Sequence, residues 1–255
     1  MTVISTFAAS HIAASGGSLS ACAPLTHVQA LNLISHCHSD IRGLLYNSCL
    51  SVIDAVSGSQ SFLYSWATVK LYYSLFYSIK SLLLIRKIGT FYHLQKPGLI
   101  EIKPGGVVRQ LTRSEAKGGS HGSALRLFEN FAPNHILVTS VGHNPSLEWI
   151  KRLREDVNYN FPRFLDPQPP VWFAKSIGSN SVRKVLASYT SDPNIYAFDP
   201  DHAALALPLL AARIAIVEAK TIGVEIDLSD QSFLVQCARD SSGTLTNLTT
   251  FLSLS

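Results

Sequence analysis

The chain is short of charge, and the shortage is greatest at its two ends. Only 15% of the 255 residues are Asp, Glu, Lys or Arg, against roughly 25% in an average soluble protein. The first 39 residues hold none of these four types, and none follows Asp240. A hydrophobic share of 47% excludes an intrinsically disordered chain, because disorder requires low hydrophobicity together with high charge.

Recognisable cofactor and metal motifs are also missing. The four cysteines form no CxxC pair, which leaves neither a zinc template nor a disulfide framework. The tripeptide His36-Cys37-His38 resembles a metal ligand set, but side chains two positions apart on a helix point to different faces. No Walker A, dinucleotide-binding, zinc-protease or nucleophile-elbow motif occurs. We therefore expect no metal site and no cofactor.

Long hydrophobic runs are absent as well. The two most apolar stretches, residues 68–85 and 203–217, are interrupted by charged side chains or proline, and neither reaches the ~18–20 apolar residues of a membrane span. The N-terminal segment lacks the basic residues of targeting signals. We expect a cytoplasmic protein without a membrane partner, and residues 1–24 are predicted to be a flexible arm. The net charge of +4 permits a polyanionic partner without requiring one.

Apolar residues at steps of three and four predict a mainly α-helical domain over residues 25–240. A β-hairpin is expected at about 95–112, around the turn Lys103-Pro104-Gly105-Gly106. The four prolines within 162–170 predict an irregular connector, and residues 241–255 are predicted to be a tail. The expected helices cover 27–56, 61–87, 123–132, 146–157 and 201–222, with a short strand at 135–141.

Three blocks of this sequence resemble the HEPN superfamily. The run from Tyr72 to Leu84, YYSLFYSIKSLLL, is similar to the family's second helix. Ser120-His121-Gly122, followed by apolar residues to Phe128, is similar to the start of its third helix. The segment Leu153–Tyr159, LREDVNY, resembles the end of its fourth helix. YaaC-like proteins show a similar Tyr-Tyr-Ser helix and a later His-Gly, and are the nearest competing group.

This resemblance implies an up-down helical bundle and a homodimer. Catalytic HEPN proteins are metal-independent ribonucleases, which implies an RNA-targeting effector, either an endoribonuclease or an RNA binder, in toxin–antitoxin or antiviral defence. The alternative that the resemblance leaves open is a non-catalytic protein that binds a nucleotidyltransferase-like or other protein partner. The uncharged termini favour that alternative.

The Arg-x(4–6)-His motif of those ribonucleases has one match here, Arg86 followed by His93. The resemblance implies a catalytic pair, in which histidine transfers protons near neutral pH and arginine stabilises charge on the phosphorane. However, Gly89 and Thr90 disfavour one continuous helix through both residues, and the family's motif lies later in the bundle. The alternative is an exposed helix end, where Arg86 and Lys87 complement the helix dipole.

His121 is the other catalytic candidate. It follows the flexible Gly118-Gly119-Ser120 and precedes a helix that carries Arg126, which we expect to bind nucleic acid. The same loop leaves open a small-molecule enzyme, and the alternative role for His121 is a cap or a core hydrogen bond. A later basic cluster is predicted either to contact phosphates or to be the solvated face of a helix; it consists of Lys151, Arg152 and Arg154.

Overall fold

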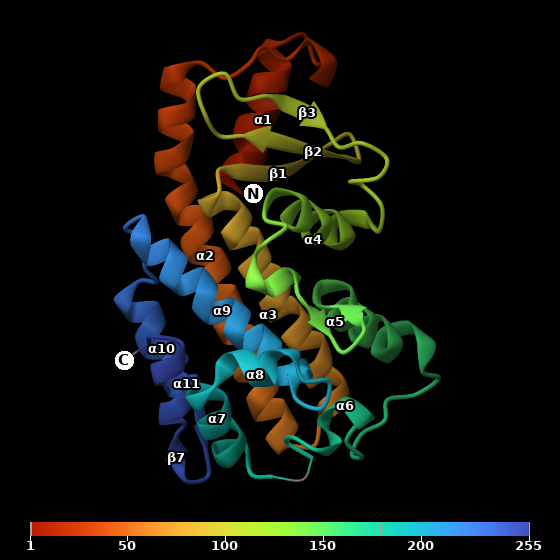
Figure 1. Ribbon diagram of the computed structural model, residues 1–255. Helices are drawn as coiled ribbons and strands as arrows, with labels where there is room; N and C mark the ends of the chain where they lie inside the picture. The colour runs from red at the N-terminus through yellow and green to blue at the C-terminus, as the bar shows by residue number, and fades with distance from the viewer. Residues whose placement is uncertain (1, 179, 255) are drawn as a thin grey trace.

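Two long antiparallel helices, α2 (His27–Gln60) and α3 (Tyr64–Ile85), form the centre of the fold (Figure 1). The computed structural model describes residues 2–178 and 180–254. A capping box between Thr26 and Gln29 starts α2, as this pair satisfies two free backbone N–H groups. The third long helix, α9 (Ala203–Thr221), packs along α3. The helix predicted over 61–87 corresponds to α3, which is buried on most of its surface.

Small polar residues set the contact between α2 and α3. The hydroxyl of Ser48 on α2 lies 2.8 Å from that of Ser78 and donates to the carbonyl of Ser74 over 3.0 Å. All three serines are buried. Buried hydroxyls need such partners, and their small size lets the two backbones approach closely.

A three-stranded antiparallel sheet covers one end of this bundle. Its strands are β1 (Ile88–His93), β2 (Lys96–Glu101) and β3 (Val108–Gln110), in the order β1-β2-β3. The predicted hairpin corresponds to β2 and β3. The first strand corrects the expectation of a helix to residue 87, because α3 ends at Ile85 and Lys87 adopts a positive φ of 63°.

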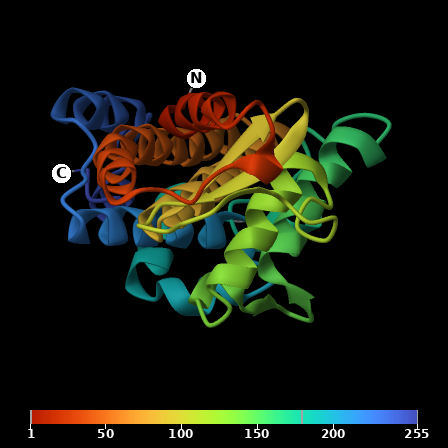
Figure 2. The ribbon, with the colours of Figure 1, turned by 90° about the horizontal axis from the view of Figure 1, so that it is seen from above.

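The N-terminal residues are not the flexible arm expected for 1–24. They contain α1 (Val3–Ala14) and a 3-10 turn, η1 (Leu19–Ala21). Asp40 of α2 accepts hydrogen bonds from the N–H groups of Val3 and Ile4 at 3.2 and 3.3 Å. Figure 2 shows α1 beside α2 and next to the sheet. The buried side chains of α1 share one face: Ile4, Ala8 and Ile12.

The chain after the sheet packs around the three long helices. The C-terminal end is not a tail, because α11 packs on α7 and buries Leu248 and Phe251. The segment 161–170 has no helix or strand, as the prolines predicted. At 135–141 the expected strand is divided into a 3-10 turn over 136–138 and a two-residue strand at 140–141. The remaining elements are α4 (Gly119–Phe131), η2 (Ile136–Val138), β4 (Ser140–Val141), β5 (Asn144–Pro145), α5 (Ser146–Glu155), the π-helical η3 (Asp156–Asn160), α6 (Val171–Ala174), α7 (Val182–Ser191), α8 (Pro193–Phe198), α10 (Leu228–Cys237), β6 (Arg239–Asp240), β7 (Gly243–Thr244) and α11 (Thr246–Phe251).

The fold is thus mainly helical, with three small antiparallel sheets in the part of the chain that is described. Within residues 2–178 and 180–254, no helix combines the length and the apolar character needed to cross a membrane.

Candidate functional site

A histidine lies among aromatic rings where α4 meets α3. His121, in the first turn of α4, stacks on Phe76 with ring centroids 4.3 Å apart and an angle of 17° between the planes. Its ring is also nearly parallel to that of Tyr72, at 5.5 Å, and edge-on to that of Tyr73, at 5.5 Å. Because Tyr72 and Phe76 are four residues apart, they share one face of α3. We call Tyr72, Phe76 and His121 the aromatic–histidine stack.

A hydrogen bond fixes the imidazole within the stack. The Tyr72 hydroxyl lies 2.9 Å from Nδ1 of His121. Burial raises the pKa of Tyr72 well above its ordinary value, so this hydroxyl keeps its proton near neutral pH. When the hydroxyl donates to Nδ1, the imidazole carries its own proton on Nε2. That arrangement leaves a neutral histidine with an N–H group for a ligand.

Two cations border the aromatic–histidine stack, one at each end. The guanidinium carbon of Arg154, from α5, lies 5.6 Å from the centroid of the Tyr72 ring and 5.2 Å from that of Tyr159. At the other end, Nζ of Lys80 lies 5.7 Å from the centroid of the Phe76 ring. These distances are within the range of cation–π attraction.

Burial and the neighbouring cations together keep the histidine uncharged. Burial, together with the positive charges of Arg154 and Lys80, lowers the pKa of His121. The imidazole is therefore neutral at physiological pH. Burial by itself would lower the pKa of the Arg154 guanidinium. The interactions with the Tyr73 hydroxyl and with neighbouring tyrosines outweigh the effect of burial and raise that pKa. The result is a neutral imidazole beside a permanently charged arginine.

Arg154 also retains unused hydrogen-bonding capacity. Its Nε is buried and has no hydrogen-bond partner among the described residues. No carboxylate of the described chain forms an ion pair with its guanidinium. Since buried polar groups normally find partners, and arginine binds phosphate oxygens through paired N–H groups, this side chain is suited to an anionic ligand.

The site unites the three sequence blocks that carry the family resemblance. The first block supplies Tyr72 and Phe76, the second His121, and the third Arg154 and Tyr159. The sequence analysis named His121 and Arg154 but did not identify Tyr72, Phe76 or Lys80 as part of the site. The available signal was the spacing of Tyr72, Phe76 and Lys80, which repeats every four residues on α3.

Arg86 lies away from this cluster, in a structural ion pair. Its Nη1 and Nη2 donate to the two carboxylate oxygens of Glu218 on α9 at 2.7 and 3.0 Å. His135 lies 3.3 Å from the same carboxylate. The guanidinium also lies over the ring of Phe128, at 5.5 Å from its centroid. Together these contacts attach the end of α3 to α9, to α4 and to the segment after α4.

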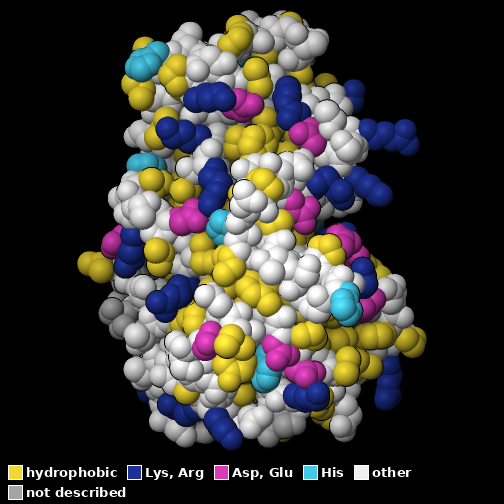
Figure 3. Space-filling model, viewed as in Figure 1, with side chains coloured by type: hydrophobic (Ala, Val, Ile, Leu, Met, Phe, Trp, Pro, Cys, Tyr) yellow, Lys and Arg dark blue, Asp and Glu magenta, His cyan; other side chains and the backbone are white. Residues whose placement is uncertain are grey.

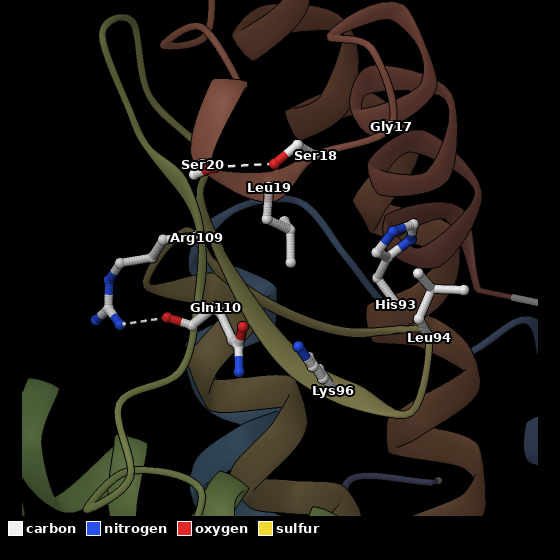
Figure 4. Close-up of a pocket in the computed structure, with 9 residues that line it drawn as sticks. All are labelled: Gly17, Ser18, Leu19, Ser20, His93, Leu94, Lys96, Arg109 and Gln110. Carbon is white, nitrogen blue, oxygen red and sulfur yellow. Dashed lines mark hydrogen bonds between the residues drawn. The ribbon is translucent and has the colours of Figure 1, made fainter.

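His93 is at the opposite end of the sheet region, at the last position of β1. It lines a cavity of about 390 Å³ together with Leu19 and Lys96 (Figure 4). In Figure 4 the guanidinium of Arg109 turns away from this cavity, toward the carbonyl of Gln110. The structure therefore does not bring His93 together with Arg86, whose partners are on α9.

The predicted nucleic-acid-binding residues differ in their surroundings. Lys151 is engaged by Glu148 at 3.2 Å and by Glu155 at 3.6 Å. Arg152 is exposed, with Nη1 3.5 Å from the side-chain oxygen of Asn144. Arg126, on α4, is half-buried, and its Nε has no hydrogen-bond partner among the described residues. Among the described contacts, Arg154 is the one predicted nucleic-acid-binding residue that touches the aromatic–histidine stack.

No group of three or more His, Cys, Asp or Glu side chains within residues 2–178 and 180–254 is arranged to hold a metal ion. Comparison with known proteins gives no relative: no family model matches the chain, and neither a curated protein nor a solved structure is significantly similar to it.

Proposed function

We propose that this protein is an HEPN-like, RNA-targeting effector that cleaves RNA at the aromatic–histidine stack without a metal ion. One observation carries this proposal: a neutral His121 lies among aromatic rings, with Arg154 at one end and Lys80 at the other. Aromatic rings beside cations suit single-stranded nucleic acid, because bases stack on the rings while cations attract the backbone. The meeting of the three resembling blocks at this site also supports the assignment.

The chemistry assigned to the site is transfer within the RNA chain. The 2′-hydroxyl oxygen attacks the neighbouring phosphorus, and the bond from phosphorus to the 5′-oxygen breaks. A base takes the proton of the 2′-hydroxyl, and the departing 5′-oxygen receives a proton from an acid. His121, which is neutral, is assigned the role of the base: in the tautomer that carries its proton on Nδ1, toward the Tyr72 hydroxyl oxygen, the free Nε2 takes the proton of the 2′-hydroxyl. Arg154 is assigned the stabilisation of charge on the phosphorane. The products are a 2′,3′-cyclic phosphate and a 5′-hydroxyl end.

A homodimer and a role in toxin–antitoxin or antiviral defence belong to the same proposal. In catalytic HEPN proteins two protomers present their motifs across an interface, so a second copy would supply the second proton-transfer group. The neutral imidazole of one protomer is the base, and the partner's histidine, in its imidazolium form, gives a proton to the departing 5′-oxygen.

The proposal is tested by incubating the purified protein with end-labelled RNA in EDTA, which removes the metals of contaminating nucleases. We expect cleavage that leaves cyclic phosphate ends. His121→Gln, which preserves packing against Phe76, is expected to lower the rate by about 10²–10⁴-fold, as for loss of a general acid–base group. The matched control is His143→Ala, because His143 is exposed on the β4–β5 turn.

The proposal of a ribonuclease would be refuted if the folded, dimeric wild-type protein left RNA intact. So would cleavage that His121→Gln and Arg154→Met both leave unchanged. Far-UV circular dichroism of each variant separates loss of chemistry from loss of fold. The variants Arg86→Met and His93→Ala complete the series, since both residues are sequence candidates that lie outside the stack.

An exposed apolar surface favours a second candidate function, partner binding without catalysis. Trp66 and Phe164 are 51% and 44% exposed, and their rings pack edge-to-face with centroids 5.7 Å apart. Phe62, Leu63 and Val171 are also exposed. Figure 3 shows hydrophobic side chains gathered at the lower right of the molecule, and such surfaces often mark protein interfaces. A pull-down in which Trp66→Ser loses a partner retained by His121→Gln would establish this function.

A further inference from the structure

A second cavity lies next to the aromatic–histidine stack, on the Phe76 side. It has a volume of about 400 Å³ and is enclosed by residues of α1, α3, β1, β2 and α4. Phe76 and Phe91 contribute rings to its wall, while Thr90, Ser120 and Ser123 contribute hydroxyls. Pockets that hold small molecules have this composition, with apolar walls and a few polar groups, and volumes of roughly 300–1,000 Å³.

One charged residue, Lys80, lines this cavity among the described residues. Its side chain is half-buried, and within the described chain its ammonium group has no hydrogen bond or ion pair. The nearest acidic influence is Asp40, which is engaged by the backbone N–H groups of Val3 and Ile4. Burial lowers the pKa of Lys80. Partial burial of a cation without a counter-ion costs free energy, and a bound anion would offset that cost.

We propose that this cavity is a binding site for a small organic anion that carries one charged group on a flat, largely apolar body. The charged group binds Nζ of Lys80, and the hydroxyls of Thr90 and Ser120 are available for further hydrogen bonds, since neither donates nor accepts one within the described chain. The flat body lies between the rings of Phe76 and Phe91. A single cation and no acidic residue among the described lining residues fit a ligand with a single anionic group.

The shape of the walls supports a flat ligand. Gly98 of β2 contributes to the lining, and any side chain there would collide with the ring of Phe91. Glycine at this point therefore lets the Phe91 ring lie flat against the strand, which leaves the cavity open beside it. On the α1 side, the small residues Ser5 and Ala9 face the same space.

This cavity shares Phe76 and Lys80 with the surroundings of the aromatic–histidine stack, but Arg154 and His121 are not part of its described lining. Binding of a small anion is measured directly in the absence of RNA, so its failure is distinguishable from a failure of the proposed cleavage. Both anionic chemistries that fit, carboxylate and phosphate monoester, share the contact with Lys80. The probes 2-naphthoate and adenosine 5′-monophosphate distinguish them, with 2-naphthol and adenosine as the matched uncharged compounds.

The test is isothermal titration calorimetry of the full chain with these four compounds. At least one of the two anions is expected to bind with one site per chain, about tenfold or more tighter than its uncharged counterpart, as one charge-assisted hydrogen bond provides. Lys80→Met keeps the shape of the side chain and is expected to abolish this preference. Ala9→Phe fills the mouth of the cavity and is expected to abolish binding.

Ala13→Phe is the matched control, because Ala13 is also exposed on α1 but does not line the cavity. It is expected to bind the anion as the wild type does. Each variant is first shown to be folded by circular dichroism. The inference is overturned when the folded wild type binds neither anion at millimolar concentration. It is equally overturned when Lys80→Met binds the anion as tightly as the wild type, or when Ala9→Phe leaves binding unchanged.

Discussion

The ion pair between Arg86 and Glu218 gives a direct test of what Arg86 does. Both side chains are partly buried, with exposed fractions of 25% and 30%. Arg86→Met removes two hydrogen bonds, at 2.7 and 3.0 Å, and leaves the Glu218 carboxylate half-buried with His135 as its remaining partner. The methionine preserves much of the apolar contact with Phe128. We therefore expect Arg86→Met to reduce the stability of the fold.

The magnitude follows from the burial. Exposed ion pairs contribute about 0–1 kcal/mol, whereas breaking a buried one costs about 3–5 kcal/mol. With roughly a quarter of each side chain exposed, we expect a loss of about 2 kcal/mol. For a chain of this length, 1 kcal/mol shifts Tm by about 2–4 °C, so the expected decrease is about 4–8 °C.

The assay is thermal unfolding followed by far-UV circular dichroism for Arg86→Met, Glu218→Gln and the double variant. Because the two residues form one interaction, the double variant is expected to lose less than the sum of the two single losses. Additive losses, or an unchanged Tm for Arg86→Met, would refute the structural role. RNA cleavage lost in Arg86→Met at full stability would instead place Arg86 in the chemistry.

The same pair makes stability depend on pH. Burial alone would raise the pKa of Glu218, but hydrogen bonds from His135 and Arg86 outweigh it and lower the pKa. A carboxylate with a lowered pKa in the folded state contributes stability above its ordinary pKa of about 4.3, and that contribution is lost as pH falls through the folded value. Glu218→Gln is therefore expected to lose less stability than the wild type between neutral pH and pH 3.

Three further outcomes are expected. Burial raises the pKa of Cys49 to about 12, and burial together with Asp40 raises that of Cys37 to about 12. At pH 8, Ellman's reagent should therefore react quickly with only the other two of the four thiols in the folded protein, and with all four after denaturation. Rapid reaction of a third thiol in the folded protein would contradict this. Lys80→Met should raise the pKa of His121, because it removes one of the charges that lower it. The measurement is an NMR titration of the imidazole signals, in which His121→Gln identifies the signal of His121. An unchanged pKa in Lys80→Met would show that the charge has no influence. Gly89→Val should lower Tm, because even a Cβ would lie 2.6 Å from Cγ2 of Ile100 and 2.9 Å from Cδ1 of Ile4; an unchanged Tm would show that α1 moves away freely.

The long helices were predictable because their own residues encode them. Apolar residues at three- and four-residue steps mark α2, α3 and α9, and the turn at residues 103–106 marks the hairpin. The first helix was missed because it depends on distant partners. The face of α1 formed by Ile4, Ala8 and Ile12 is buried only once the sheet and α2 are in place. The first strand was missed for a local reason: β1 pairs with the adjacent β2 through a turn at Leu94 and Gln95, whose positive φ values are not marked by the glycine or asparagine typical of such turns.

The site shows the same division between local and distant information. His121 and Arg154 could be named from their chemistry and position. The partner of Arg86 could not, since Glu218 is 132 positions away and no local pattern connects the two. The spacing of Tyr72 and Phe76 is compatible with both core packing and a binding site, and it is the approach of α4 that places a histidine on the two rings.

The charges around His121 give the proposed cleavage and the proposed ligand site a common physical basis. Arg154 and Lys80 both lower its pKa, so each makes protonation of the imidazole less favourable in the absence of an anion. A negative group that binds either cation offsets that repulsion and raises the histidine's affinity for a proton. An anion in the cavity beside Lys80 would therefore act on His121 through charge, with Phe76 between them. If the proposed cleavage takes place at His121, we therefore expect its imidazole to accept a proton more readily when an anion occupies the cavity.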